Sequence, residues 1–567
     1  MLKIGILLIL CTFLAQIEAK SFRQVFRPGF IDGIPLRDHY AKQFIDPVDY
    51  EKCVKTPGSF NVTIFNFTQP LDHFDSNNKG NWSQQVQYRN DIFKKRDDGD
   101  IIFLMVGGES PVPTPLLCFL TYTWGQLAVE HGAFMFQLEH RYFGTSAPTP
   151  DLNTTNLKWL TTELALADIN AFIPAMNTKF NFTKPKWVAF GGSYPGTMAA
   201  LLRVVYPNIT NGNIASSAPL WAKVDFWEYA EKMEQAIQWE SQVNKSNAAC
   251  YNETKNAFSY IKTAVYTDAG RNELNSVFQP NVRLGANMSN IDLDSTNFLS
   301  GVFGIFQGII QYTFDDRNKD TINVTGLNVA NLCQYMVDTR YNYTQRLYNV
   351  YSWTAAWGGY NPVPFDNDYW NDISFWRETS FQSGAAAYRG WMWLSCNEFG
   401  WLQTTDNGYG IFQNLIPLSF YLRYCTDVFG PTINNDYIQK HVTSTSRKYG
   451  VPWRYNGTNV VLPNGSLDPW STLGCNVSDD SVHRKVRTTV GGAHCVDMYP
   501  YTPNSTDSVE PNDVINTINL IKNETRYYVS LAGPFGGTTS GNTTSSGLST
   551  RIQFGYLLAG MLSYFVM

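Results

Sequence analysis

The sequence has no dense block of lysine or arginine and no internal repeat. Its 43 lysines and arginines against 48 acidic residues give a net charge of −5 over 567 residues. Because no basic stripe is available to neutralise phosphates, the chain is not expected to bind nucleic acid. Its two terminal apolar runs, 4–14 and 554–567, are both shorter than the roughly 20 residues of a membrane-spanning helix. Only seven histidines are present, so few residues could serve as a catalytic base.

The first 19 residues have the pattern of a cleaved secretory signal, with one early cation at Lys3, an apolar core and a terminal Ala19. Eight cysteines remain after it, and an even count in a secreted chain favours disulfides. Seventeen N-x-S/T sequons indicate the same compartment and are predicted glycosylation sites: Asn61, Asn66, Asn81, Asn153, Asn181, Asn208, Asn244, Asn252, Asn287, Asn323, Asn342, Asn456, Asn464, Asn476, Asn504, Asn523 and Asn542.

The other end of the chain is a Gly/Ser/Thr-rich stretch, 536–550, followed by an uncharged apolar tail. Small residues, a short spacer and a terminal apolar tail form the signal for a glycolipid anchor, with attachment expected near 545–547. The alternative is a tail-anchored span, which this short run and the absence of a basic stop disfavour. The chain is therefore expected in the secretory pathway, outside the cell, at its surface or in lysosomes and endosomes, and on membranes only through this anchor.

The middle of the chain is that of a folded protein, with 44% hydrophobic and 15% aromatic residues. Apolar runs typical of buried strands, at 100–109, 132–139, 187–190 and 213–219, alternate with helix-like segments at 124–130 and 161–176. Such alternation predicts a parallel sheet covered by helices. From 221 to 445 the chain is mainly helix-like, and strand patterns return at 459–465 and 486–492. We expect a sheet domain from 48–220 and 446–530, a helical insertion at 221–445 and a tail at 531–567.

The segment 186–199, KWVAFGGSYPGTMA, has the pattern of a nucleophile elbow: a strand, a sharp turn that carries Ser193, and a helix. Small residues beside the serine are needed because the turn is strained. The match to G-x-S-x-G is imperfect, since the second glycine position holds Pro195 and Gly196 comes one residue later. An ordinary strand-to-helix turn remains the alternative.

If Ser193 is the nucleophile of such a hydrolase, an acid and then a histidine should follow it. Of the histidines downstream, His494 comes directly after a strand and a double glycine, whereas His441 and His483 lie in polar surface-like segments. Asp468 follows the strand at 460–462 and is the predicted acid, which would hold the imidazole in the tautomer that accepts the serine proton. The other candidate acids do not follow a strand: Asp479, Asp480 and Asp497.

Motifs spread from about residue 60 to 500 resemble the serine carboxypeptidase-like family of prolyl carboxypeptidase, dipeptidyl peptidase II and thymus-specific serine protease, most closely the last branch. They are FTQPLDHF (67–74), GGE (107–109), QLEHRYFG (137–144), ALADI (165–169), FGGSYPG, SSAPLWAKVDF (216–226), CNEFGWLQTT (396–405), NGSLDPW and GGAHCVDMY. The resemblance implies an α/β-hydrolase fold with a helical cap inserted between nucleophile and acid. It also implies the triad of Ser193, Asp468 and His494.

The resemblance further implies an oxyanion hole made by the amides of Tyr194 and Gly108, and cleavage beside proline with Trp470 as a wall of the proline pocket. Thr197 stands where prolyl carboxypeptidase has a pocket-lining methionine, which makes specificity less secure than catalysis. The family suggests two disulfides, Cys250–Cys333 and Cys396–Cys425. From their positions after the acid and histidine segments we expect Cys475–Cys495, and Cys53–Cys118 then remains by elimination.

The sequence thus predicts a glycosylated serine exopeptidase that acts on peptides through an acyl-enzyme, without metal or cofactor. An esterase of the same fold and a catalytically silent adhesion or receptor protein are the alternatives. Release of a carboxyl-terminal residue needs a cation facing the substrate carboxylate, and release of a dipeptide needs an acid facing its ammonium. Glu109 and Glu398 are candidate substrate contacts. The sequence does not decide between release of a carboxyl-terminal residue and release of a dipeptide, and it leaves open whether the protein forms a homodimer.

Overall fold

The computed structural model describes residues 47–285, 291–313, 326–357, 364–499 and 512–533. The predicted signal at 1–19 and the predicted anchor segment from 534 onward lie outside these ranges. So do four of the sequons, Asn287, Asn323, Asn504 and Asn542. Within the described ranges, no helix combines the length and the apolarity needed to cross a bilayer.

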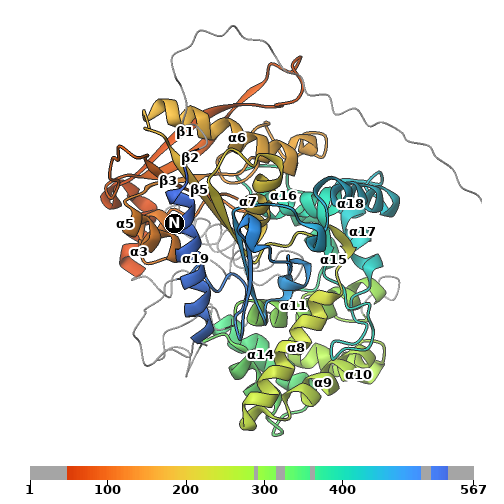
Figure 1. Ribbon diagram of the computed structural model, residues 1–567. Coiled ribbons are helices and arrows are strands. Elements are labelled where there is room, and N and C mark those ends of the chain that lie inside the picture. The colour runs from red at the N-terminus through yellow and green to blue at the C-terminus, as the bar shows by residue number, and fades with distance from the viewer. Residues whose placement is uncertain (1–46, 286–290, 314–325, 358–363, 500–511, 534–567) are drawn as a thin grey trace, which may run out of the picture.

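A mixed eight-stranded sheet lies at the centre of the first domain (Figure 1), with strand order β1-β2-β4-β3-β5-β6-β9-β10. β2 pairs antiparallel with both of its neighbours, β1 and β4. All other neighbouring strands, from β4 to β10 in the sheet order, pair parallel. The strands are β1 (Val62–Pro70), β2 (Asn81–Arg89), β3 (Ile101–Val106), β4 (Phe134–Leu138), β5 (Lys186–Gly192), β6 (Gly212–Ser216), β9 (Val460–Gly465) and β10 (Arg484–Thr489).

Helices cover both faces of this sheet, which explains why its central strands are continuous apolar runs. Leu104 of β3 belongs to a hydrophobic core that includes residues of α6 and α7. Its neighbour Phe103 belongs to a second core that includes residues of α5 and α19. Successive side chains of a strand point to opposite faces, so one apolar run supplies both cores. The helices of this domain are α3 (Pro47–Lys55), α4 (Pro115–Cys118), α5 (Thr123–His131), α6 (Thr162–Lys179), α7 (Tyr194–Val205) and α19 (Asn512–Ser530).

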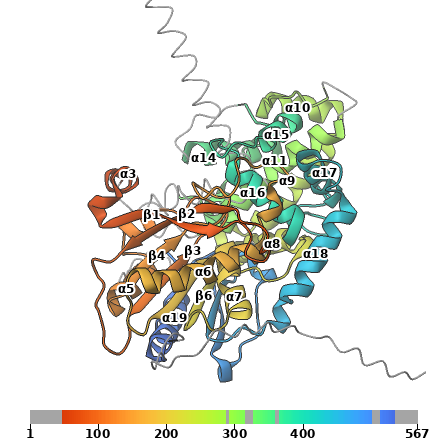
Figure 2. The same cartoon turned by 90° about the horizontal axis from the view of Figure 1, so that it is seen from above.

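A second, mainly helical layer lies beside the sheet domain in both views (Figures 1 and 2) and is formed by the chain between β6 and β9. It holds a short parallel pair, β7 (Lys223–Asp225) and β8 (Gly400–Leu402). Its helices are α8 (Glu228–Val243), α9 (Cys250–Ala264), α10 (Asp268–Phe278), α11 (Ile291–Gln311), α13 (Val329–Met336), α14 (Tyr343–Trp357), α15 (Tyr369–Trp376), α16 (Ala386–Leu394), α17 (Leu418–Phe429) and α18 (Asn435–Tyr449). We call this layer the cap.

The short helical turns of the chain are η1 (Pro57–Phe60), η2 (Leu157–Trp159), η3 (Lys245–Asn247), η5 (Ser395–Phe399), η6 (Pro452–Arg454), η7 (Pro469–Leu473) and η8 (Asp480–Val482). The parallel strands and covering helices confirm the predicted α/β-hydrolase fold. The antiparallel β1–β2 hairpin was not predicted, because β1 lies at the edge of the sheet and exposes most of its residues.

Three of the four expected disulfides are present, Cys53–Cys118, Cys250–Cys333 and Cys396–Cys425. The expected Cys475–Cys495 bond is wrong, since both residues are buried free thiols. Cys475 packs with Val460, whereas Cys495 belongs to the cluster of Val461, the next residue of β9. Adjacent strand residues face opposite sides of a sheet, so the two thiols lie on opposite faces and cannot meet.

One predicted glycosylation site is also wrong. Asn464 is only 7% exposed, and its side-chain amide donates a hydrogen bond to the Cys475 carbonyl at 3.1 Å. A glycan needs a surface asparagine. Asn244 is partly exposed, and the asparagines of the other described sequons are exposed: Asn61, Asn66, Asn81, Asn153, Asn181, Asn208, Asn252, Asn342, Asn456, Asn476 and Asn523.

Candidate active site

Ser193 lies in a sharp turn between β5 and α7 and has the strained backbone of a nucleophile elbow, with φ 64° and ψ −133°. A Cβ added to Gly191 would lie 2.2 Å from the Pro195 carbonyl oxygen, and one added to Gly196 would lie 2.6 Å from the Ser216 carbonyl oxygen. Both contacts are with backbone, which cannot move aside. The turn therefore requires glycine at both places.

This geometry accounts for the imperfect elbow motif. The second position that excludes a side chain is Gly196, so the preceding residue is free to be proline. Pro195 stands in the first turn of α7, where a missing N–H costs no helical hydrogen bond.

The three residues of the predicted triad follow the carboxyl ends of three parallel strands. Ser193 follows β5, Asp468 follows β9 and His494 follows β10, and β6 alone separates β5 from β9 in the sheet. The carboxyl ends of parallel strands meet at one edge, which is where open α/β sheets form their sites.

Asp468 and His494 form a hydrogen-bonded pair at this edge. His494 Nδ1 lies 2.9 Å from Asp468 Oδ1, and the two residues are 2% and 0% exposed. Burial disfavours the charged imidazole, but the adjacent Asp468 carboxylate and Cys495 together outweigh burial and raise the pKa of His494 well above its usual value. Asp468 Oδ1 also accepts the Trp470 amide at 2.9 Å, which fixes the carboxylate.

Ser193 reaches the same edge, although it makes no hydrogen bond to the ring, since His494 Nε2 has no hydrogen-bond partner. The loop after β6 joins the two segments. Ser193 N–H donates to the Ser216 carbonyl at 2.9 Å, and Cys495 N–H donates to Ser217 Oγ at 2.8 Å. Catalytic hydrogen bonds are often long in enzymes without substrate. The structure thus contains the hydrogen-bonded acid–base pair, and the loop after β6 connects the backbone of Ser193 to the loop that carries His494.

The loop after β3 lies against the first turn of α7. A Cβ on Gly108 would lie 2.3 Å from Pro195 Cγ, so the backbone of Gly108 lies in contact with the elbow. The Gly107 amide already donates to the Leu138 carbonyl at 2.9 Å. Gly108 is therefore the glycine of this loop that suits an oxyanion hole, together with the Tyr194 amide at the start of α7.

Two candidate substrate contacts, Glu398 and Thr197, make hydrogen bonds within the scaffold. Glu398 accepts hydrogen bonds from the N–H and the hydroxyl of Thr162, at 2.9 and 2.6 Å, and so caps α6. Burial raises the pKa of Glu398 to about 7. Thr197 is 1% exposed, and its hydroxyl donates to the Pro219 carbonyl at 2.7 Å. These contacts engage both side chains in the scaffold, and their contact with substrate stays a prediction.

Glu109 behaves differently, because it lines a hollow of about 530 Å³ beside the elbow. Gly108, Gly192 and Pro195 line the same hollow. An acidic side chain therefore lies next to the candidate oxyanion hole, although Glu109 itself is only 8% exposed.

Trp470 lies between the catalytic loop and the cap. Its ring centroid is 6.3 Å from that of His494, 5.4 Å from that of Phe226 and 5.5 Å from that of Trp401. Its indole N–H donates to Gln311 Oε1 at 2.8 Å. The indole thus lies near the catalytic ring and is held in an aromatic cluster by cap residues.

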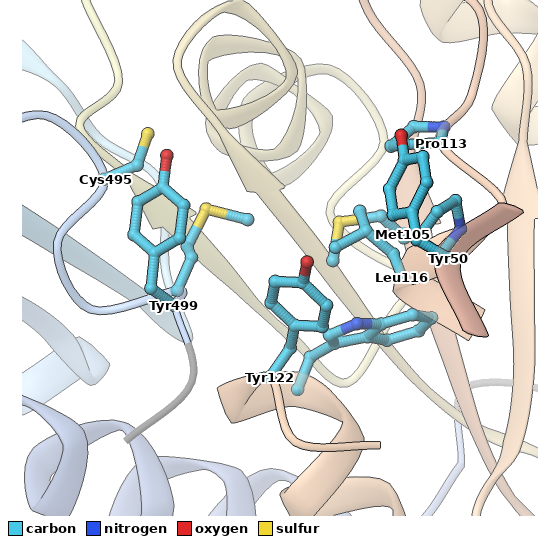
Figure 3. A pocket seen from close by; sticks show the side chains of 10 residues that line it. Tyr50, Met105, Pro113, Leu116, Tyr122, Cys495 and Tyr499 are labelled. Carbon is cyan, nitrogen blue, oxygen red and sulfur yellow. The ribbon is translucent and has the colours of Figure 1, made fainter. Parts of the chain in front are cut away.

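An apolar hollow of about 620 Å³ lies between the histidine loop, β3, α4 and the start of α5 (Figure 3) and was not predicted. Cys495 and Tyr499 enter it from the histidine loop, Met105 from β3, Leu116 from α4 and Tyr122 from the start of α5. These segments are far apart in sequence, and none carries a motif that would have pointed to a cavity.

Tyr194 also anchors the elbow from behind. Its hydroxyl donates to His140 Nε2 at 3.1 Å, because the other nitrogen, Nδ1, donates to the Arg141 carbonyl at 2.7 Å. Burial lowers the pKa of His140 to about 4, so the ring stays neutral. The remaining histidines that follow Ser193 serve the surface: His441 stacks on Tyr437, and His483 pairs with Glu524 at 3.0 Å.

A sequence model of the family described as Serine carboxypeptidase S28 matches residues 69–514. A Caenorhabditis elegans protein named as a serine protease is 38% identical over 491 residues, 85% of this chain and 87% of that protein. The human thymus-specific serine protease is 28% identical over 454 residues, 78% of this chain and 82% of its own. The human lysosomal Pro-X carboxypeptidase is 24% identical over 443 residues, 77% of this chain and 83% of its own.

Among solved structures, a proline iminopeptidase of Mycobacterium smegmatis matches 82% of this chain and 99% of its own, at 10% identity and a TM-score of 0.29. The fold assignment therefore depends on the strand order and the elbow rather than on this superposition. The family match covers both domains and every member of the predicted triad. This chain belongs to the serine carboxypeptidase S28 family and is a serine-type peptidase with the α/β-hydrolase fold.

Proposed function

We propose that this chain is a secreted or cell-surface exopeptidase that cleaves peptide bonds next to proline through a Ser193–His494–Asp468 triad. The observation that carries the proposal is the buried His494–Asp468 pair, which lies at the sheet edge that also holds the strained Ser193 turn. A histidine held by a carboxylate is the base that a serine hydroxyl needs, because the hydroxyl is a weak nucleophile by itself.

In this mechanism Ser193 Oγ attacks the scissile carbonyl, and its proton passes to His494 Nε2. Asp468 keeps the imidazole in the tautomer with the proton on Nδ1 and stabilises the imidazolium that forms. The amides of Tyr194 and Gly108 would stabilise the oxyanion. His494 then protonates the leaving amine, and a water molecule hydrolyses the acyl-enzyme by the same steps in reverse.

Trp470 is the proposed wall for the prolyl ring. Proline offers no N–H to a partner strand, so its recognition must come mainly from apolar contact. The 6.3 Å separation of the Trp470 and His494 rings supports this role, because it leaves the indole beside the reacting centre. One relative is named as a Pro-X carboxypeptidase, which supports the same substrate class.

The test is hydrolysis of matched peptides with proline or leucine at the cleaved position, together with a small ester. Burying one large apolar side chain is worth roughly 1.5 to 3 kcal/mol, so Trp470→Ala should lower kcat/KM for the proline peptide about ten- to a hundredfold. The ester should be affected less. Equal losses on both substrates, or a wild-type enzyme indifferent to proline, would remove the proline pocket from the proposal.

Secretion and surface attachment are proposed from the sequence of the two ends. The relatives named as lysosomal and extracellular carboxypeptidases support a secretory route. A lipase specific for inositol lipids should release the protein from cells if the glycolipid anchor is present. Protein that stays attached after such treatment but becomes soluble on truncation before Phe554 would indicate a different anchor.

A further inference from the structure

One cap residue contacts both the catalytic histidine and the Trp470 indole. Gln311, the last residue of α11, is 1% exposed. Its backbone carbonyl accepts the His494 N–H at 3.0 Å, and its side-chain Oε1 accepts the Trp470 indole N–H at 2.8 Å. The same Oε1 accepts the Tyr229 hydroxyl at 2.6 Å.

These three bonds connect three separate segments of the chain. Tyr229 belongs to α8 of the cap, Trp470 to η7 behind the catalytic acid, and His494 to the loop after β10. A carbonyl oxygen has two lone pairs, and both of those on Gln311 Oε1 are used. The two hydrogen bonds hold the Gln311 side chain in one conformation. This also restricts the Gln311 backbone, whose carbonyl accepts the His494 N–H.

We propose that Gln311 is a positioning residue, through which the cap sets the place of His494 and of the Trp470 indole relative to Ser193. The proposal rests on the proposed function, since it assigns Gln311 a task in that reaction. Asp468 fixes one side of the imidazole at Nδ1, and Gln311 fixes the peptide from which the ring extends. Tyr312, the next residue, adds an edge contact to the same ring, with centroids 6.1 Å apart.

The required precision explains why such a residue matters. An error of about 1 Å in a catalytic group can cost on the order of a hundredfold in rate. His494 follows Gly491 and Gly492, with Gly491 at a φ of 76°, and glycines leave a backbone more conformational freedom than other residues do. A buried anchor from the neighbouring domain removes that freedom at the point where it would affect proton transfer.

The same helix offers a matched control. Gln307 lies one turn before Gln311, is equally buried at 1% exposure, and donates its side-chain amide to Gln403, another cap residue. Its described hydrogen bond therefore stays within the cap. Loss of either glutamine should weaken cap packing, but only loss of Gln311 should disturb the catalytic loop.

The experiment compares Gln311→Met, Gln307→Met, Tyr229→Phe and Ser193→Ala as full-length secreted proteins on one proline peptide. Rates are normalised to the active sites that react with a serine-directed phosphonate. Gln311→Met keeps the length of the side chain and loses the acceptor, so kcat should fall ten- to a hundredfold while KM stays within about threefold. Tyr229→Phe, which removes one hydroxyl and preserves the ring, should lower kcat severalfold. Gln307→Met should retain wild-type kcat.

Wild-type kcat per labelled site in Gln311→Met would overturn the proposal, as would an equal fall of kcat in Gln307→Met. If Gln311→Met is not secreted, the result for Tyr229→Phe decides alone. Failure of the proposed function gives a different outcome, because Ser193→Ala would then retain activity.

Discussion

His494 Nδ1 donates to Asp468 Oδ1 across 2.9 Å at a place that solvent hardly reaches. Asp468→Asn would replace the acceptor with an amide of the same shape and favour the wrong histidine tautomer. We expect kcat to fall by about 10⁴-fold, the scale of such a change in serine proteases, with normal secretion. Peptide hydrolysis by the secreted variant measures this, and a loss of less than about tenfold would exclude Asp468 as the triad acid.

The same pair predicts the pH dependence of activity. The Asp468 carboxylate, together with Cys495, raises the pKa of His494 well above 6.5, and only the neutral ring can accept the Ser193 proton. Activity should therefore be lost as the pH falls, and the acid limb of kcat/KM should lie above pH 6.5. In the Asp468→Asn variant, the acid limb of the residual kcat/KM should move to lower pH. An acid limb well below 6.5 in the wild-type enzyme would contradict this coupling.

Stability should depend on pH through two titratable groups whose pKa values are shifted in opposite directions. The pKa of His140 is lowered to about 4, so its contribution is complete above pH 6.5 and is lost as the pH falls toward 4. The pKa of Glu398 is raised to about 7, so its contribution is complete below pH 4.5 and is lost as the pH rises through 7. Between pH 4.5 and 6.5 the two effects oppose each other.

Removing one group should therefore reveal the other. Tm of Glu398→Gln should rise with pH between 4.5 and 6.5 more steeply than that of the wild type, and Tm of His140→Gln should fall over the same range. Scanning calorimetry of the secreted proteins measures both slopes. Parallel profiles for the three proteins would show that neither group has the stated pKa.

The elbow predicts an unequal response of two glycines to alanine. In Gly196→Ala the new methyl would lie 2.6 Å from the Ser216 carbonyl, whereas Gly58 has nothing within 4 Å of its Cβ position. Overpacking of this kind costs about 1 to 3 kcal/mol, and here it also displaces the nucleophile. We expect Gly196→Ala to lose most activity and some thermal stability. Gly58→Ala serves as the control, and equal behaviour of the two variants would contradict the elbow geometry.

Much of the sheet domain could be predicted because its signals are local. The apolar runs of β3 and β5, the glycines around Ser193 and the strand before His494 each lie within a few residues. Asp468 could be selected from the downstream acids by the strand that precedes it. One of the alternatives, Asp497, has another task, since it accepts the Ser216 hydroxyl at 2.5 Å.

The remaining features depend on contacts between distant segments. Glu398 meets Thr162 across 236 positions, and Trp470 meets Gln311 across 159. Neither pairing leaves a pattern in the sequence. The Cys475–Cys495 prediction failed for a related reason, because nearness to the two catalytic loops says nothing about which face of the sheet a side chain occupies. Strand alternation decides that, and it separates the two thiols.

The most direct test of the proposed triad is labelling with an active-site serine phosphonate, followed by peptide mapping. The account predicts one phosphonylated residue, Ser193, in the secreted wild-type protein, reduced labelling in His494→Ala, and none in Ser193→Ala, which should also lack peptide hydrolysis. Labelling or near wild-type hydrolysis that persists in secreted Ser193→Ala would contradict the mechanism.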